Sequence, residues 1–191
     1  MRTLACPTRA RPIVSGLLLA CLAVPVSANA GEPKNAAQPG ATATAPTPHL
    51  LDRFKALAGT WSATGLDGNS MPDAQIRYEV TAGGSAVVET LFPGSPHEMR
   101  TVYVRDGADV VLTHFCASGN HPRMRAKAID GDKVAFAFDG ATNFDPAAAG
   151  HMHDAHFTFV GPDELRTRWN FWSKGKPAEH AANLHVKRIA D

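Results

Sequence analysis

The spacing of apolar side chains changes once along the chain, from a helical period to a period of two. Leu50, Phe54 and Leu57 recur at i, i+4 and i+7, the spacing that places side chains on one face of a helix. Thr47-Pro48 precedes them and Gly59 follows. Because these residue types cap, start and end helices, we predict one short helix here.

Beyond residue 60, apolar and polar residues alternate, which is typical of strands with one buried face. Ile76, Tyr78 and Val80, for example, alternate with Arg77 and Glu79. Turn-forming residues separate these segments, and every proline after residue 48 is expected in such a break, since proline cannot donate a ladder hydrogen bond. The predicted strands are 60–65, 75–81, 86–92, 98–105, 109–117, 123–129, 133–139, 151–160, 164–172 and 181–189.

Ten short strands with no helix between them predict an antiparallel meander. A long meander with one apolar face closes on itself, because closure removes the exposed edges. We therefore predict an all-β fold, an up-and-down antiparallel β-barrel of eight to ten strands, preceded by one short N-terminal helix. Barrels of this size either fill their interior with side chains or enclose one small ligand.

The first 30 residues have the pattern of a secretory signal peptide. Three arginines precede an apolar run, residues 13–26, and small residues end at Ala30. The run has 14 residues, whereas a membrane-spanning helix needs about 20. We expect a periplasmic or secreted protein. An alternative interpretation takes residues 18–21 as a lipobox and Cys21 as the anchored first residue of a lipoprotein, but the residues after Cys21 are apolar where such a tether is normally polar.

Residues 31–48 contain four prolines and no large apolar side chain, so we predict a disordered linker and a single domain at 49–191. Removing residues 1–30 takes away three arginines and leaves 16 basic against 18 acidic side chains, a net charge of −2. No basic patch remains, so we expect no nucleic-acid partner. Cys116 is then the one remaining cysteine, and no disulfide is expected.

Two features at the ends of the domain carry a resemblance. Gly59-Thr60-Trp61 opens the first predicted strand, and Arg188 lies in the last. This resembles the lipocalin and fatty-acid-binding (calycin) superfamily. The resemblance implies structural roles for Gly59, Trp61 and Arg188, in which the tryptophan closes one barrel end and the arginine packs over its ring. The chain departs from secreted lipocalins in having no disulfide and no clear second motif.

A closer resemblance is to a group of uncharacterised exported bacterial proteins with a lipocalin-like barrel. Their recurrent features correspond to residues 113–116, 119–124 and 151–153. This resemblance implies no established activity. The haem-binding nitrobindins have a similar barrel with a histidine ligand, which we can assign to neither His180 nor His185.

Histidines carry the candidate chemistry, because all nine lie within 49–191. His151 and His153 alternate along their strand toward Phe157 and Phe159, so we expect both imidazoles to point inward near one barrel mouth. His114 shares a face of 109–117 with Val110, Leu112 and Cys116, and alternation leaves open which face is inside.

Three imidazoles, from His114, His151 and His153, could hold zinc, copper or iron; they could equally line a polar cavity rim. A Cys116–His114 nucleophile and base would need a third orienting group that the sequence does not show, so we predict no catalytic residue and leave open whether the protein is an enzyme. Arg123 could bind an anion from a loop. Glu89 is expected to point outward.

The predicted function is binding of a small, largely apolar ligand inside the barrel. Its proposed polar contacts are His114, Cys116, Arg123, His151 and His153. The alternatives are a metal-binding barrel or metalloenzyme using the three histidines, a haem-binding barrel, and a filled barrel without a ligand. The residues expected to form the apolar wall are Phe136, Phe138, Phe157, Phe159, Trp169 and Phe171.

Overall fold

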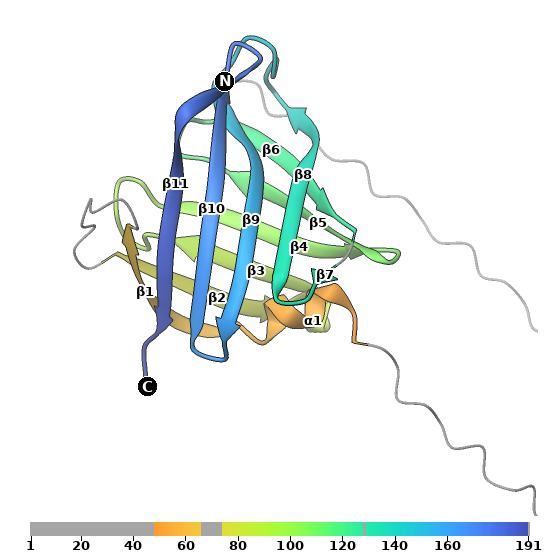
Figure 1. Ribbon diagram of the computed structural model, residues 1–191, viewed down its shortest axis with the longest axis vertical. Helices are drawn as coiled ribbons and strands as arrows, with labels where there is room; N and C mark the ends of the chain where they lie inside the picture. Colours follow the sequence, from red (N-terminus) through yellow and green to blue (C-terminus); the bar gives the residue numbers. More distant parts are fainter. Residues whose placement is uncertain (1–47, 66–73, 128, 191) are drawn as a thin grey trace, which may run out of the picture. The chain divides into compact units, whose positions relative to one another are not determined.

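The computed structural model describes residues 48–65, 74–127 and 129–190, and most of them lie in one β-barrel (Figure 1). The predicted signal peptide at 1–30, with Cys21, and the predicted linker up to Thr47 lie outside the described residues. The elements are α1 (Leu50–Lys55), β1 (Gly59–Gly65), β2 (Gln75–Thr81), a 3-10 turn (Ala82–Gly84), β3 (Ala86–Leu91), β4 (Met99–Asp106), β5 (Asp109–Phe115), β6 (His121–Ala126), β7 (Ile129–Asp130), β8 (Lys133–Thr142), β9 (His151–Gly161), β10 (Glu164–Ser173) and β11 (Lys176–Arg188).

Ten of these strands form a closed antiparallel barrel. Their order is β6-β5-β4-β3-β2-β1-β11-β10-β9-β8, and pairing between β6 and β8 closes the ring. The two-residue strand β7 pairs with β8. The predicted fold class, an antiparallel meander barrel preceded by one short helix, is confirmed and is consistent with a calycin-like fold.

Several strand boundaries differ from the prediction, and at the starts of β6 and β11 a proline lies inside the strand. β6 contains Pro122 and β11 contains Pro177, although we expected both in turns. Pro122 is opposite Ala141 of β8, and the pairing of β6 with β5 starts only at Arg123. Pro177 lies beside the hairpin turn. At such ends a missing N–H costs little, so these prolines are tolerated.

The helix begins later than the sequence suggested. Its N-cap is His49 rather than Thr47, and the first helical residue is Leu50 rather than Pro48. The His49 Nδ1 accepts a hydrogen bond from the Leu51 N–H at 3.0 Å, and the Asp52 carboxylate accepts one from the His49 N–H at 2.9 Å. This reciprocal pair satisfies donors that a helix start leaves free.

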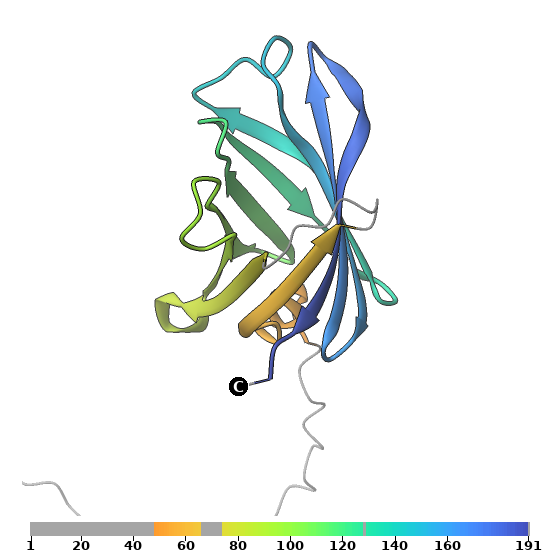
Figure 2. The same ribbon diagram turned by 90° about the vertical axis from the view of Figure 1, so that its left-hand side faces the viewer.

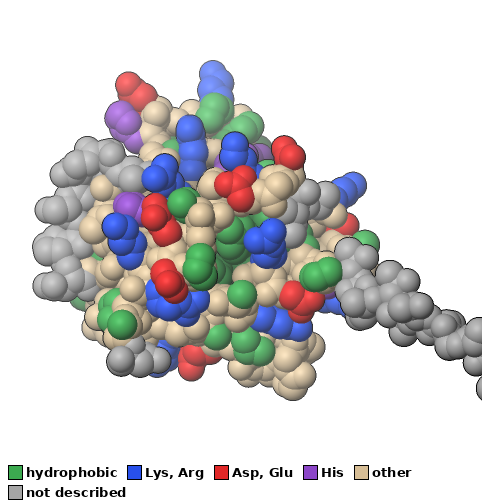
Figure 3. All heavy atoms as spheres, turned by 60° about the horizontal axis from the view of Figure 1, so that its bottom comes forward, with side chains coloured by type: hydrophobic (Ala, Val, Ile, Leu, Met, Phe, Trp, Pro, Cys, Tyr) green, Lys and Arg blue, Asp and Glu red, His purple; other side chains and the backbone are tan. Residues whose placement is uncertain are grey.

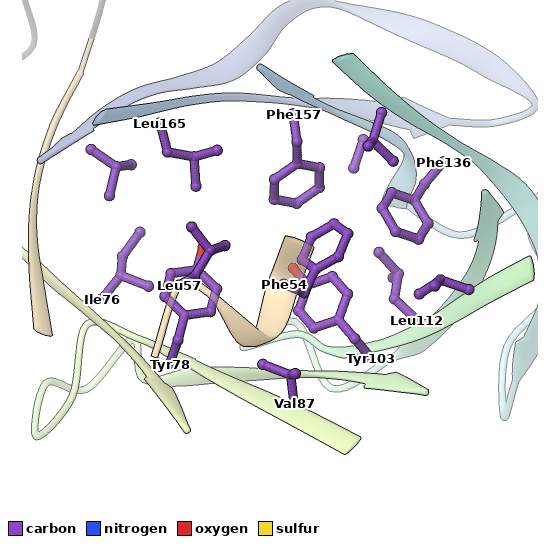
Figure 4. Packing of buried hydrophobic residues seen from close by; sticks show 14 of the residues in the cluster. Phe54, Leu57, Ile76, Tyr78, Val87, Tyr103, Leu112, Phe136, Phe157 and Leu165 are labelled. Atoms are coloured by element: carbon purple, nitrogen blue, oxygen red, sulfur yellow. The ribbon is translucent and has the colours of Figure 1, made fainter. Parts of the chain in front are cut away.

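Helix α1 lies at one end of the barrel (Figures 1 and 2). Phe54 is fully buried and stacks on Tyr103 with ring centres 4.6 Å apart. Its ring also meets Phe136, Phe157 and Phe159 edge-on. Figure 4 shows Phe54 in the middle of this packing. The α1 end of the interior is therefore occupied by side chains.

Acidic and basic side chains alternate over the α1 end of the molecule without a large area of one charge (Figure 3). Among the described residues, no helix is long and apolar enough to cross a membrane.

Candidate functional site

The barrel interior holds a buried carboxyl group. Glu89 of β3 is 1% exposed, and its two carboxyl oxygens accept hydrogen bonds of 2.7 Å from the Tyr78 and Tyr103 hydroxyls. The prediction that Glu89 points outward is wrong. Its strand is buried on both faces, since Ala86 and Thr90 are also buried, and alternation cannot identify the inner face of such a strand.

Burial controls the ionisation of this group. It raises the pKa of Glu89, while hydrogen bonds from Tyr103, Tyr78 and Thr101 act in the opposite direction. Burial also raises the pKa of both tyrosines well above their usual range. The tyrosines are therefore neutral hydroxyl donors to Glu89.

The polar chain continues through Thr101 to His114. The Thr101 Oγ1 lies 2.9 Å from the His114 Nδ1. His114 is 2% exposed, which shows that its side of β5, with Val110 and Leu112, faces the interior. Burial lowers the pKa of His114 to about 4, so its imidazole is neutral near pH 7.

One nitrogen of His114 is left without a partner. Its Nε2 is buried and makes no hydrogen bond to any described residue, and the same holds for the Thr167 Oγ1 on β10. The His114 ring lies against Trp169, with ring centres 5.0 Å apart. An apolar wall thus adjoins an imidazole with one free hydrogen-bonding position.

Strand register places the Thr101–His114 pair next to the filled end of the barrel, on the side away from α1. Tyr103, which stacks on Phe54 of α1, is opposite Leu112, and Thr101 is opposite His114. Because alternate residues face inward, the Thr101–His114 pair lies one layer further from α1. The interior therefore has an apolar layer against α1 and a polar layer beyond it.

The six aromatic residues predicted as a cavity wall have different surroundings. Phe136 and Phe157 are fully packed against Phe54, and Phe159 packs partly against the same core. The structure thus places them in the filled layer. Trp169 is buried beside His114, while Phe138 and Phe171 are only partly buried.

A second histidine group lies on β9. The His151 Nε2 is 3.0 Å from the His153 Nδ1, and the His151 Nδ1 is 3.0 Å from the Ala149 carbonyl oxygen. The His153 ring is stacked between Phe138, at 4.7 Å, and Trp172, at 3.9 Å. His151 is buried and His153 partly buried, so both are held by aromatic side chains and by each other.

A β-bulge explains why alternation does not describe these two residues. Asn170 of β10 is opposite Asp154, but the next residue, Phe171, is opposite Met152. One extra residue, His153, is inserted into β9, and such an insertion changes the direction of the side chains around it. The expected shared face from residue 151 to 159 is therefore interrupted.

The three histidines do not come together. No group of three His, Cys, Asp or Glu side chains in the described part of the chain is arranged to hold a metal ion. His114 contacts Thr101 and Trp169, whereas His151 and His153 contact each other. The proposed three-histidine metal site is not formed.

The remaining candidates are exposed or only partly buried. Arg123 is on the outer face and donates hydrogen bonds to the Asp139 carbonyl and carboxylate. Cys116 is partly buried at the end of β5 and starts the turn to Asn120. His180 is exposed, and the His185 Nε2 is 2.8 Å from Glu164.

An open hollow of about 810 Å³ lies along β6, β8 and β9. Its one arginine, Arg125, is held by Asp106, Asp109 and Asp139 at 2.8–3.2 Å. Because those carboxylates neutralise Arg125, this hollow offers no free guanidinium to an anion.

The sequence interpretation missed Thr101, Tyr78 and Tyr103 as parts of a site. A usable signal was present, because Thr101 and Tyr103 are two residues apart and so share one face of their strand, as do Ile76 and Tyr78.

A comparison with known protein families finds no family whose model matches the chain, and a comparison with curated proteins finds no match either.

Proposed function

We propose that the protein binds a small, largely apolar ligand in the barrel interior, on the side of His114 that faces away from α1. The observation that carries this proposal is the buried His114 Nε2 without a partner among the described residues. Leaving a buried polar atom unpaired costs about 1–3 kcal/mol. A ligand that bonds to this atom removes the cost.

The surroundings have the composition of a ligand site. Such sites are mostly apolar and contain a few polar groups that fix the orientation of the ligand. Trp169 supplies an apolar surface beside His114. Thr167, whose hydroxyl also has no partner among the described residues, is opposite Phe157 in the filled layer and belongs to that end of the interior. The filled layer around Phe54 closes the other end of the interior.

We further propose that the protein is exported, on the basis of the signal pattern at 1–30 and the resemblance to exported bacterial proteins with lipocalin-like barrels. Mass measurement of the exported form tests this part. Cleavage after Ala30 gives a chain that starts at Gly31, whereas a lipoprotein starts at a modified Cys21.

Native mass spectrometry of the protein purified from its own compartment tests ligand binding. We expect an additional organic mass on the wild type and on His97→Phe, since His97 is exposed. We expect loss of that mass from His114→Phe, which keeps an aromatic ring against Trp169 but removes both nitrogens. A wild-type protein without a bound organic molecule contradicts the proposal.

A further inference from the structure

One stretch of the barrel wall has no backbone ladder. The pairing of β8 with β9 ends where Phe136 is opposite Ala155. Beyond this point β8 is paired with β6 as far as Thr142, while β9 remains paired with β10. Figure 2 shows β8 and β9 parting toward the end of the barrel opposite α1. No ladder pair joins residues 137–142 of β8 to residues 151–154 of β9.

Aromatic side chains close the wall at this place. The His153 ring lies flat against Phe138 of β8, with ring centres 4.7 Å apart, and against Trp172 of β10, at 3.9 Å. The His151 ring is 5.2 Å from Phe138 and 5.1 Å from Phe144, which lies in the segment between β8 and β9. We call these five residues the aromatic plug. Packed rings thus replace hydrogen-bonded strands in this part of the wall.

Hydrogen bonds hold the β9 side of the aromatic plug. The His151 ring is bonded through Nδ1 to the Ala149 carbonyl oxygen and through Nε2 to the His153 Nδ1, each at 3.0 Å. The Asn120 Nδ2 donates to the Gly150 carbonyl oxygen at 2.7 Å, which ties the turn before β6 to the start of β9. Phe138, the plug residue of β8, has no polar group in its side chain. The contact between the two strands therefore depends on the packing of rings.

Opening the barrel at the aromatic plug breaks no ladder hydrogen bond. Separating two paired strands elsewhere breaks several, and segments with few backbone bonds open most readily in a native protein. The gap begins at Ala155, which is opposite Trp169 of β10. Trp169 lies against His114. A molecule that passes between the plug rings therefore arrives beside the imidazole at which the ligand is proposed to bind.

We propose that the aromatic plug is the gate through which the ligand enters and leaves the barrel. This inference rests on the proposed function and adds to it the path between solvent and the site. His153 is the central ring of the gate, because it contacts rings from both neighbouring strands. Removing this ring speeds passage, and replacing it by another flat ring keeps the wall closed.

Access through the gate is measurable without a ligand, by the rate at which a thiol reagent labels a buried cysteine. Cys116→Ser removes the one thiol of the chain that starts at Gly31. Ala155→Cys then places a thiol at a fully buried position where β8 and β9 part. Ala63→Cys, on β1 and also buried, is the reference site. Global unfolding exposes both thiols, so the ratio of their labelling rates reports the gate.

His153→Ala should raise this ratio about tenfold, the equivalent of one lost aromatic contact. His153→Phe keeps a ring between Phe138 and Trp172 and should preserve the wild-type ratio. His156→Ala is the control on the same strand, because His156 is exposed and contacts no plug residue. If His153→Ala folds too weakly, Phe138→Ala removes the facing ring from β8 and must give the same increase. A ratio that stays at the wild-type value in both alanine variants overturns the inference.

Ligand exchange is measurable by stopped-flow fluorescence with N-phenyl-1-naphthylamine, a neutral apolar probe that emits more strongly when buried. A gate lies on the path and is not part of the bound complex. His153→Ala should therefore raise the association and dissociation rate constants together, by about tenfold, and leave Kd within about twofold of the wild-type value. Faster dissociation with unchanged association would make His153 part of the binding site and overturns the gate.

The outcomes separate the gate from the proposed function. Probe binding at rates that His153→Ala does not change overturns the gate and leaves the ligand-binding function standing. A wild type that retains no organic molecule and does not bind the probe overturns the proposed function, and the gate as a ligand entrance with it.

Discussion

The Arg188 guanidinium covers the Trp61 ring, with its central carbon 4.3 Å from the ring centroid. The same group donates to the Ala58 and Ala56 carbonyl oxygens at 2.7 and 2.9 Å and to the Asp163 carboxylate at 2.9 Å. The Trp61 Nε1–H donates to the Leu57 carbonyl at 2.7 Å. One arginine thus joins the last strand, the first strand and the segment after α1.

Arg188→Ala should therefore destabilise the protein by about 2–3 kcal/mol, since it removes a cation–π contact and hydrogen bonds from a charged donor. Arg188→Lys should recover part of this loss, because an ammonium keeps the charge but lacks the planar fork. Urea unfolding measures both. Arg166→Ala is the matched control, since Arg166 is exposed with a single contact to Glu164 at 3.5 Å. Equal stability of Arg188→Ala and Arg166→Ala would contradict the assigned role.

Phe54→Ala should be more damaging. Phe54 has no exposed surface and meets four aromatic rings, and emptying such a site typically costs about 3–5 kcal/mol. Lys55→Ala on the same helix should change the free energy of unfolding by less than about 0.5 kcal/mol. Urea unfolding of both variants checks the difference. A small loss in Phe54→Ala would mean that α1 does not support the barrel.

The barrel could be predicted because most strands have one buried face. Ile76 and Tyr78 are buried while Arg77 and Glu79 are exposed, so period two was visible. Glu89 could not be placed in this way, because its strand is buried on both faces. A run of apolar residues around one carboxylate does not show which side chains point into the barrel.

The histidine site illustrates a second limit. Strand β9 has a β-bulge, with one inserted residue between Met152 and Asp154. The sequence His151-Met152-His153 contains no turn-forming residue that would indicate this bulge. Phe54 could be recognised as a helix residue, but its packing on Tyr103, Phe136 and Phe157 depends on contacts between residues distant in sequence. Local periodicity therefore predicted the strands well and the contents of the barrel poorly.

His114 should make stability depend on pH. Its pKa in the folded protein is about 4, below the ordinary 6.5, so the folded state holds it neutral. The resulting stability is complete above pH 6.5 and is lost as the pH falls toward 4, by about 3 kcal/mol in total. Glu89 acts with the opposite sign, because its raised pKa favours the folded state as the pH falls.

Urea unfolding at pH 7 and pH 4.5 isolates the contribution of His114. The loss of stability between these two values should be about 2 kcal/mol smaller in His114→Phe than in the wild type. His97→Phe, at an exposed histidine, should show the wild-type loss. If His114→Phe folds too weakly, His114→Gln serves the same purpose. An unchanged pH dependence in these His114 variants would show that His114 is not buried in the neutral form.

His153 offers a test of the second histidine group. Burial lowers its pKa, the charge of His151 lowers it further, and the Asp154 carboxylate raises it. His151→Phe should therefore raise the pKa of His153, and Asp154→Asn should lower it. NMR titration of the His153 ring measures both shifts. The two substitutions must move the His153 pKa in opposite directions; a shift of the same sign in both would mean that packing between Phe138 and Trp172 controls this imidazole, rather than its charged neighbours.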